Sequence, residues 1–211
     1  MNIRKKTISL VVMAVLAALL VIMPVTPLGY IPIGPLAATT NMIPVAIGAI
    51  LLGPEGGAAL GLVFGLTSFA NAAGVLGAPS ALGTAIMAVN PFLTFVVCVI
   101  PRILEGVLAG FISKGLWKTK VPKAASCGIT GFATAALNTI FFMTALILCF
   151  TPLLKESGRW AEGKNVFAFI VAFVWFNALL ELAVSAAITS VVGYALYKAG
   201  LTTVQLKKAR A

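Results

Sequence analysis

Histidine and aspartate are absent from this 211-residue sequence, and its only carboxylate side chains belong to five glutamates. Without histidine, neither a Ser-His-Asp triad nor most transition-metal sites can form, and without aspartate a paired-aspartate acid–base site is excluded. We therefore predict that the protein is not an enzyme, and we expect no catalytic residues, no metal site and no cofactor.

Charged residues of either sign are scarce: they make up 9% of the chain, whereas hydrophobic residues make up 61%. A soluble domain carries roughly a quarter charged residues. This composition predicts an integral membrane protein with the lipid bilayer as its solvent. The net charge of +10 does not indicate a nucleic-acid partner, because the basic residues lie at the ends of apolar runs and form no amphipathic face with stacking aromatics.

The apolar residues form six runs that are separated by proline, glycine or charged residues. A bilayer core of about 30 Å requires about 20 helical residues. We therefore predict an all-α integral membrane protein with six transmembrane helices in a single transmembrane domain, residues 1–211. The predicted spans are 8–25, 36–53, 56–73, 92–113, 123–151 and 166–197.

The basic residues predict the orientation of these spans, since cytoplasmic loops carry an excess of lysine and arginine. With the N-terminus inside, eleven of the fifteen basic residues fall in cytoplasmic segments, three fall in outer segments, and Arg102 falls within a span. Both termini are therefore predicted to be cytoplasmic.

Three outer segments follow from this topology. Residues 24–35 contain four prolines, which restrict the backbone, and Tyr30 lies near their middle, so we expect a stiff, partly apolar cap. Residues 73–90 are rich in glycine and small side chains and carry no charge. They are either a movable gate or an ordinary interfacial loop. Residues 155–164 are charged and are predicted to be solvated.

No segment can couple transport to an energy source by itself. The two halves share neither broken-helix positions nor charge placement, which argues against the inverted repeats of many secondary transporters. A P-loop for nucleotide binding is absent as well. Active transport by this protein would therefore need an energy-supplying partner.

Three charged residues, Arg102, Glu105 and Glu181, are predicted to lie within spans. Each would cost a few kcal/mol if it faced lipid at the midplane, so each should face the protein interior. Arg102 and Glu105 are three residues apart and can share a helix face, while Glu181 lies at similar depth and is the alternative partner. Both structural pairing and ligand binding remain open for these groups.

Three asparagines, Asn90, Asn138 and Asn177, are the other strong polar groups in or near the spans. Asn177 lies four residues before Glu181, on the same helix face. A cavity lined by amides, a carboxylate and Arg102 could hold a small molecule with both donors and acceptors. Hydrogen bonding between helices explains each asparagine separately but explains the set less well.

Several segments in order along the chain carry a resemblance to a known family. They are residues 28–35, 43–54, 61–69, 90–91, 101–106 and 138–139, with the Asn177 and Glu181 pair. On these segments the sequence resembles the S components of energy-coupling factor (ECF) transporters, which are six-helix vitamin-binding proteins of bacterial and some archaeal cell membranes.

The resemblance implies a mechanism and partners. S components bind a vitamin from outside, associate with a transmembrane coupling subunit and two cytoplasmic ATPases, and topple in the membrane to release the vitamin inside. An Ala-x-x-x-Ala motif on the first helix of the family meets the coupling subunit, and Ala14 and Ala18 match it. Small side chains of this kind permit a close and separable helix contact. We expect a location in the bacterial cell membrane.

The branch that the sequence resembles most is the pantothenate type, although members often have histidine where this chain has Met42. Pantothenate carries a carboxylate, an amide and hydroxyls, which suit Arg102 and the asparagines. Hydroxymethylpyrimidine, pyridoxine, folate and riboflavin are alternative ligands, and a proton-coupled carrier that uses Glu105 and Glu181 is an alternative function. The predicted substrate-binding residues are Tyr30, Asn90, Arg102, Asn138, Asn177 and Glu181.

Overall fold

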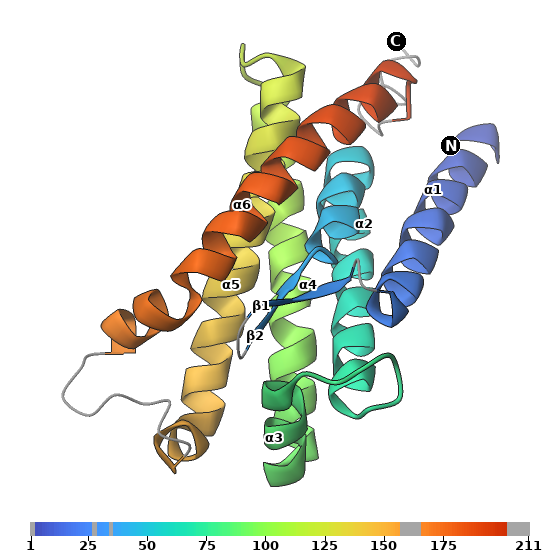
Figure 1. Ribbon diagram of the computed structural model, residues 1–211. Coiled ribbons are helices and arrows are strands. Elements are labelled where there is room, and N and C mark those ends of the chain that lie inside the picture. Colours follow the sequence, from blue (N-terminus) through green and yellow to red (C-terminus); the bar gives the residue numbers. More distant parts are fainter. Residues whose placement is uncertain (1–2, 27–28, 34–35, 157–165, 202–211) are drawn as a thin grey trace.

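A computed structural model of the protein describes residues 3–26, 29–33, 36–156 and 166–201. These residues form a helical bundle with one pair of short strands (Figure 1). The elements are α1 (Ile3–Ile22), the 3-10 helix η1 (Met23–Val25), β1 (Tyr30–Ile33), β2 (Leu36–Thr39), α2 (Met42–Ala72), α3 (Ala81–Val89), α4 (Pro91–Leu116), α5 (Lys123–Glu156) and α6 (Val166–Lys198).

Within the described residues, five helices are long and apolar enough to cross a membrane, namely α1, α2, α4, α5 and α6. The predicted helical, multi-pass membrane fold is confirmed. The start of α1 and the end of α6 lie at the same end of the bundle (Figure 1). Basic residues predict this to be the cytoplasmic end, and we use that name for it.

The second and third predicted spans are two arms of α2, which reverses direction at Gly53. This glycine has φ 77° and ψ −162° and is followed by Pro54, a backbone that glycine adopts at no steric cost. Gly48 packs against Leu60, and Ala49 packs against Gly57, so the arms run antiparallel. The first arm, residues 42–52, is about 16 Å long and therefore covers only half of a bilayer core.

Two sequence predictions of local structure are wrong. The helix predicted to begin at residue 36 begins at Met42, because residues 36–39 instead pair with β1, with Tyr30 opposite Thr39. A short apolar run does not distinguish a strand from a helix. The strands lie about midway between the two ends of the bundle (Figure 1).

The outer segment predicted over residues 73–90 also differs, because it contains the short helix α3. Ser80 caps this helix: its Oγ accepts a hydrogen bond of 3.0 Å from the backbone N–H of Gly83, which satisfies one of the free donors of the first turn. The candidate gate is therefore a loop of residues 73–80 followed by a helix.

Two apolar clusters form the core. One joins α1, α2 and α5 through buried residues such as Leu20 and Phe64. The other joins α3, α4 and α5 through residues such as Ile86 and Phe150. Phe64 and Ile86 both line one cavity, so this cavity and its polar groups border both clusters.

The second arm of α2 lies directly on α4. Cβ atoms added to the glycines of this arm would overlap the α4 backbone, so only glycine fits at these positions. The contact fixes the position of α4 along the bundle axis relative to α2, and with it the positions of the α4 side chains. The pairs are Gly57 with Gly106, Gly61 with Arg102, and Gly65 with Val99.

Replacing Gly57 with alanine should destabilise the bundle, because the added Cβ would overlap the carbonyl group of Gly106. Overpacking costs about 1–3 kcal/mol, so we expect thermal unfolding in detergent several degrees below that of the unmodified protein. Gly115→Ala is the matched control, since a Cβ there meets nothing within 4 Å. Equal unfolding temperatures for the two variants would contradict the packing described here.

Candidate functional site

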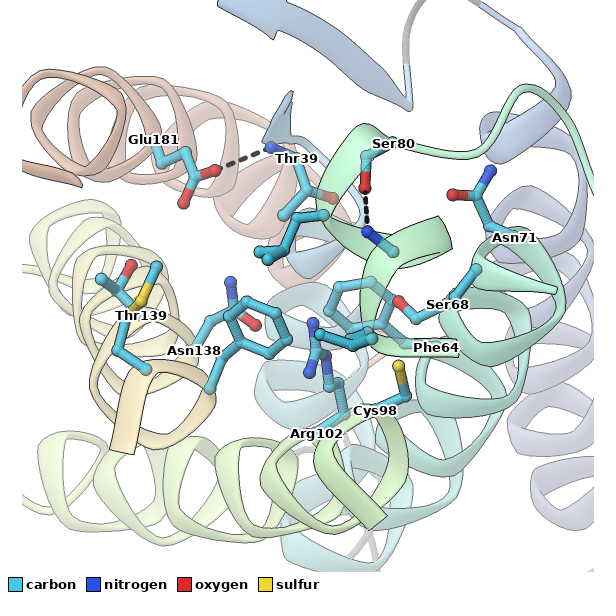
Figure 2. Close-up of a pocket in the computed structure, with 16 residues that line it drawn as sticks. Thr39, Phe64, Ser68, Asn71, Ser80, Cys98, Arg102, Asn138, Thr139 and Glu181 are labelled. Atoms are coloured by element: carbon cyan, nitrogen blue, oxygen red, sulfur yellow. Dashed lines mark hydrogen bonds between the residues drawn. The ribbon is translucent and has the colours of Figure 1, made fainter. Parts of the chain in front are cut away.

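A cavity of about 120 Å³ lies between α2, α3, α4, α5, α6 and β2 (Figure 2). Its volume is several times what a single water needs. Apolar walls come from α2, α3 and α5, and the polar groups come from β2, α2, α4, α5, α6 and the residue before α3. The polar lining residues are Thr39, Ser68, Asn71, Ser80, Arg102, Asn138, Thr139 and Glu181.

Arg102 is held by its own helix. Pro101 has no N–H, so the carbonyl of Val97, four residues earlier, lacks its usual helical donor. The guanidinium of Arg102 donates to this carbonyl from Nη1 at 2.8 Å. A proline inside α4 thus creates the acceptor that fixes an arginine in the cavity wall.

Two aromatic rings complete the surroundings of this guanidinium. Its central carbon lies 4.3 Å from the ring centroid of Phe142 and 5.3 Å from that of Phe64, which are favourable cation–π distances. Arg102 is only 6% exposed, and no carboxylate of the described residues forms an ion pair with it. Its buried Nε has no hydrogen-bond partner there either, and Arg102 lines the cavity.

Glu181 has a different partner. Its Oε1 accepts a hydrogen bond of 2.7 Å from the backbone N–H of Thr39 (Figure 2). Thr39 Oγ1 in turn accepts a hydrogen bond of 3.2 Å from the N–H of Asn41. These bonds tie β2, and the start of α2, to α6 beside the cavity.

Asn138 brings an open acceptor to the cavity from α5. The residue is 5% exposed, and its Oδ1 has no partner among the described residues. Buried polar atoms almost always have a hydrogen-bond partner in native proteins. A donor on a bound molecule or an ordered water would satisfy this oxygen.

Ser80 and α3 line the cavity, and the loop of residues 73–80 leads to them from α2. Asn71 holds the loop, since its Nδ2 donates to the carbonyls of Leu76 at 2.8 Å and Ala78 at 3.1 Å. Gly74 and Gly77 have φ values of 73° and 71°, which side chains rarely adopt. The loop conformation therefore depends on two glycines and on the amide of Asn71.

Three of the six predicted substrate-binding residues line the cavity: Arg102, Asn138 and Glu181. Asn90 does not, because it caps α4 instead: its Oδ1 accepts from the N–H of Leu93 at 3.1 Å. Asparagine followed by proline is a helix-start signal, which the sequence did offer. The side chains of Tyr30 and Asn177 lie outside the described part of the chain, although the Tyr30 backbone pairs with Thr39.

The sequence predictions missed several lining residues. Phe64, Ser68 and Asn71 follow one another at spacings of four and three on α2, which places them on one helix face. That spacing was a usable signal. Thr39 carried no such signal, because its segment resembled the start of a helix. The aromatic pair around Arg102 also depends on packing that joins α2 and α5.

The predicted partner-binding residues lie on the outside of the bundle. Ala14 and Ala18 are exposed on α1, and their neighbours Val11 and Val15 are each 55% exposed. Small residues flanked by exposed apolar side chains leave this face of α1 open to lipid or to another membrane helix.

Comparison with known proteins places the chain in a family. The family described as "ECF transporter, substrate-specific component" matches residues 9–193, which is most of the sequence. The chain belongs to this family. It is an S component of an ECF transporter, and hence a transport protein of the membrane and not an enzyme. An S component works with an energising module.

Two relatives of this S component have names that state a ligand. Pantothenic acid transporter PanT of Lactococcus lactis subsp. cremoris is 34% identical over 171 residues, which cover 78% of this chain and 80% of the relative. Pantothenate transporter PanT of Leuconostoc mesenteroides subsp. mesenteroides is 28% identical over 195 residues, or 89% of this chain and 91% of the relative. The similarity extends over most of the S component.

Replacing Asn71 with leucine should loosen the loop of residues 73–80. Leucine keeps the size of the side chain but removes both donors to Leu76 and Ala78. Each hydrogen bond contributes about 1 kcal/mol, so we expect amide hydrogen exchange in residues 74–80 to accelerate at least about tenfold. Exchange in residues 57–65 serves as the internal reference.

Thr119→Val is the control for this experiment, since it removes two exposed hydrogen bonds at the other end of the bundle, one donated to the Leu116 carbonyl and one accepted from the N–H of Val121. It should leave exchange in residues 74–80 unchanged. Unchanged exchange in the Asn71 variant would mean that the amide does not hold the loop.

Proposed function

We propose that this S component binds pantothenate in the cavity beside Arg102 and delivers it through an ATP-driven coupling module. The observation that carries the proposal is a buried guanidinium without a carboxylate partner among the described residues. A buried, unpaired charge is costly, and an anionic ligand would supply the missing counter-ion. The two relatives named as pantothenate transporters support the same ligand.

The functional groups of pantothenate match those of the cavity. Its carboxylate can accept charge-assisted hydrogen bonds from Arg102. Its amide and hydroxyl donors suit the open Oδ1 of Asn138, and its acceptors suit the hydroxyl of Thr139. Met42, where branch members often have histidine, is 1% exposed and offers no donor, so we assign the polar contacts to Arg102 and Asn138.

The alternative vitamins fit less well. Hydroxymethylpyrimidine, pyridoxine and riboflavin have no carboxylate and would leave Arg102 without a counter-ion. Folate has carboxylates but is much larger than pantothenate, whereas the cavity is about 120 Å³. An acidic ligand of modest size is therefore favoured.

The energising module in this proposal consists of a transmembrane coupling subunit and two cytoplasmic ATPases. We assign the contact with the coupling subunit to the α1 face around Ala14 and Ala18, because it is exposed and small side chains let helices approach closely. Binding and docking would then use different residues, since α1 does not line the cavity, so that each can be altered separately.

Arg102→Gln should weaken pantothenate binding about 10- to 100-fold, because a hydrogen bond to a charged group contributes about 1.5–3 kcal/mol. Isothermal titration of the detergent-purified protein would measure the change. Panthenol, in which a CH₂OH group replaces the carboxylate, should bind both proteins with similar affinity. If Arg102→Gln lowered the affinity for pantothenate and panthenol equally, the substitution would have damaged the whole site.

The same titration tests the function itself, with unmodified protein and with pyridoxine, riboflavin, folate and hydroxymethylpyrimidine beside pantothenate. We expect pantothenate to bind most tightly. If a well-folded sample did not bind pantothenate but bound one of the other four compounds, the proposed ligand would be wrong.

Ala14→Trp and Ala18→Trp should weaken docking to the coupling subunit and leave pantothenate affinity unchanged, because the added rings would hold the helices apart. Co-purification with the coupling module measures docking. Leu148→Trp on α5, at a position that is 77% exposed, is the matched control and should dock normally. Intact docking of both alanine variants would remove α1 from the interface.

A further inference from the structure

Glu105 is the most completely buried charged residue of the described chain, and the proposed function does not use it. It is 0% exposed, and neither carboxylate oxygen has a hydrogen-bond partner among the described residues. Leaving a buried carboxylate unpaired is costly. A partner in another arrangement of the protein would remove this cost.

The available partner is Arg102. The two residues are three apart on α4, so their side chains are neighbours on the helix surface. In this structure the guanidinium turns the other way, toward the carbonyl of Val97, five residues before it. Rotation of the arginine side chain about its own bonds would exchange that carbonyl for the carboxylate of Glu105.

The backbone around this pair has little freedom to move. A Cβ on Gly61 would overlap the backbone at Arg102, and a Cβ on Gly57 would overlap the backbone at Gly106, next to Glu105. The tight contact of α2 with α4 therefore fixes both Cα positions. Any exchange of partners is confined to the side chains.

We infer that Glu105 competes with the ligand carboxylate for Arg102 and so limits the affinity for the ligand and favours its release. This inference rests on the proposed function. With ligand bound, Arg102 pairs with the ligand. When Arg102 turns to Glu105, the ligand loses its counter-ion.

The position of Glu105 agrees with a role in release. α4 runs from its outer end at Pro91 to its cytoplasmic end at Leu116, so Glu105 lies one helical turn to the cytoplasmic side of Arg102. Glu181 is not equivalent, because its Oε1 already accepts the N–H of Thr39. The competitor is therefore assigned to Glu105.

Glu105→Gln tests the inference, since it keeps the side-chain shape and removes the carboxyl group that would pair with Arg102. We expect pantothenate to bind at least about fivefold more tightly to this variant in isothermal titration. Panthenol, which has no carboxylate, should bind as it does to the unmodified protein. Uptake of saturating pantothenate into liposomes by the complete complex, with its coupling subunit and ATPases, should be slower.

Glu55→Gln is the matched control. It makes the same substitution at an exposed position beside the Gly53 turn, and it should change neither affinity nor uptake. A merely structural role for Glu105 would weaken the binding of pantothenate and panthenol together. That result, or unchanged pantothenate affinity, would overturn the inference.

Two further outcomes separate this inference from the proposed function. If the unmodified protein does not bind pantothenate, the proposed function fails first. If the unmodified protein binds pantothenate but Glu105→Gln binds it no better, only the role of Glu105 fails. Should Glu105→Gln not fold, Glu105→Met is measured instead, and failure of both to fold would make Glu105 a structural residue and contradict the competition.

Discussion

The charge of Arg102 has to be accommodated inside a membrane-spanning bundle without a carboxylate partner among the described residues, and the rest of the site is arranged around it. Three neighbours hold the guanidinium: the Val97 carbonyl and the rings of Phe64 and Phe142. The carbonyl is free because Pro101 cannot donate to it. The rings come from α2 and α5, so three helices have to be in register before the cation is stabilised.

That register depends on small residues. The glycine face of α2 brings its backbone into contact with α4 at the level of Arg102, and Phe64 belongs to the same arm. Side chains larger than hydrogen would separate the helices and move the ring away from the guanidinium. The apolar contact between α2 and α4 therefore also determines which groups surround the Arg102 guanidinium.

The middle of the bundle is also where the chain departs from continuous spanning helices. The first arm of α2 is too short to cross the bilayer, and the pair β1 and β2 precedes it at similar depth (Figure 1). Non-helical backbone is tolerated at such depth only where protein or water satisfies its polar groups. The carboxylate of Glu181 does so for the N–H of Thr39, which makes this glutamate part of the cavity wall.

The sequence predicted the long spans and the inward-facing Arg102, because apolar length and the cost of a lipid-exposed charge are local properties. It did not predict the partner of Arg102, since both candidate glutamates were plausible by spacing alone and the described structure pairs it with neither. It misplaced Asn90, whose position before a proline serves to cap a helix. The strands β1 and β2 could not be predicted, because segments of four residues are too short to show the alternation of apolar and polar residues that is typical of a strand.

The central claim is that Arg102 keeps its charge available for the carboxylate of the ligand. An experimental structure of the protein with bound pantothenate tests it most directly. We expect the ligand carboxylate within hydrogen-bond distance of the Arg102 guanidinium, between Phe64 and Phe142. Pantothenate bound elsewhere, or an Arg102 paired with Glu105 or Glu181 while the ligand is bound, would contradict the account.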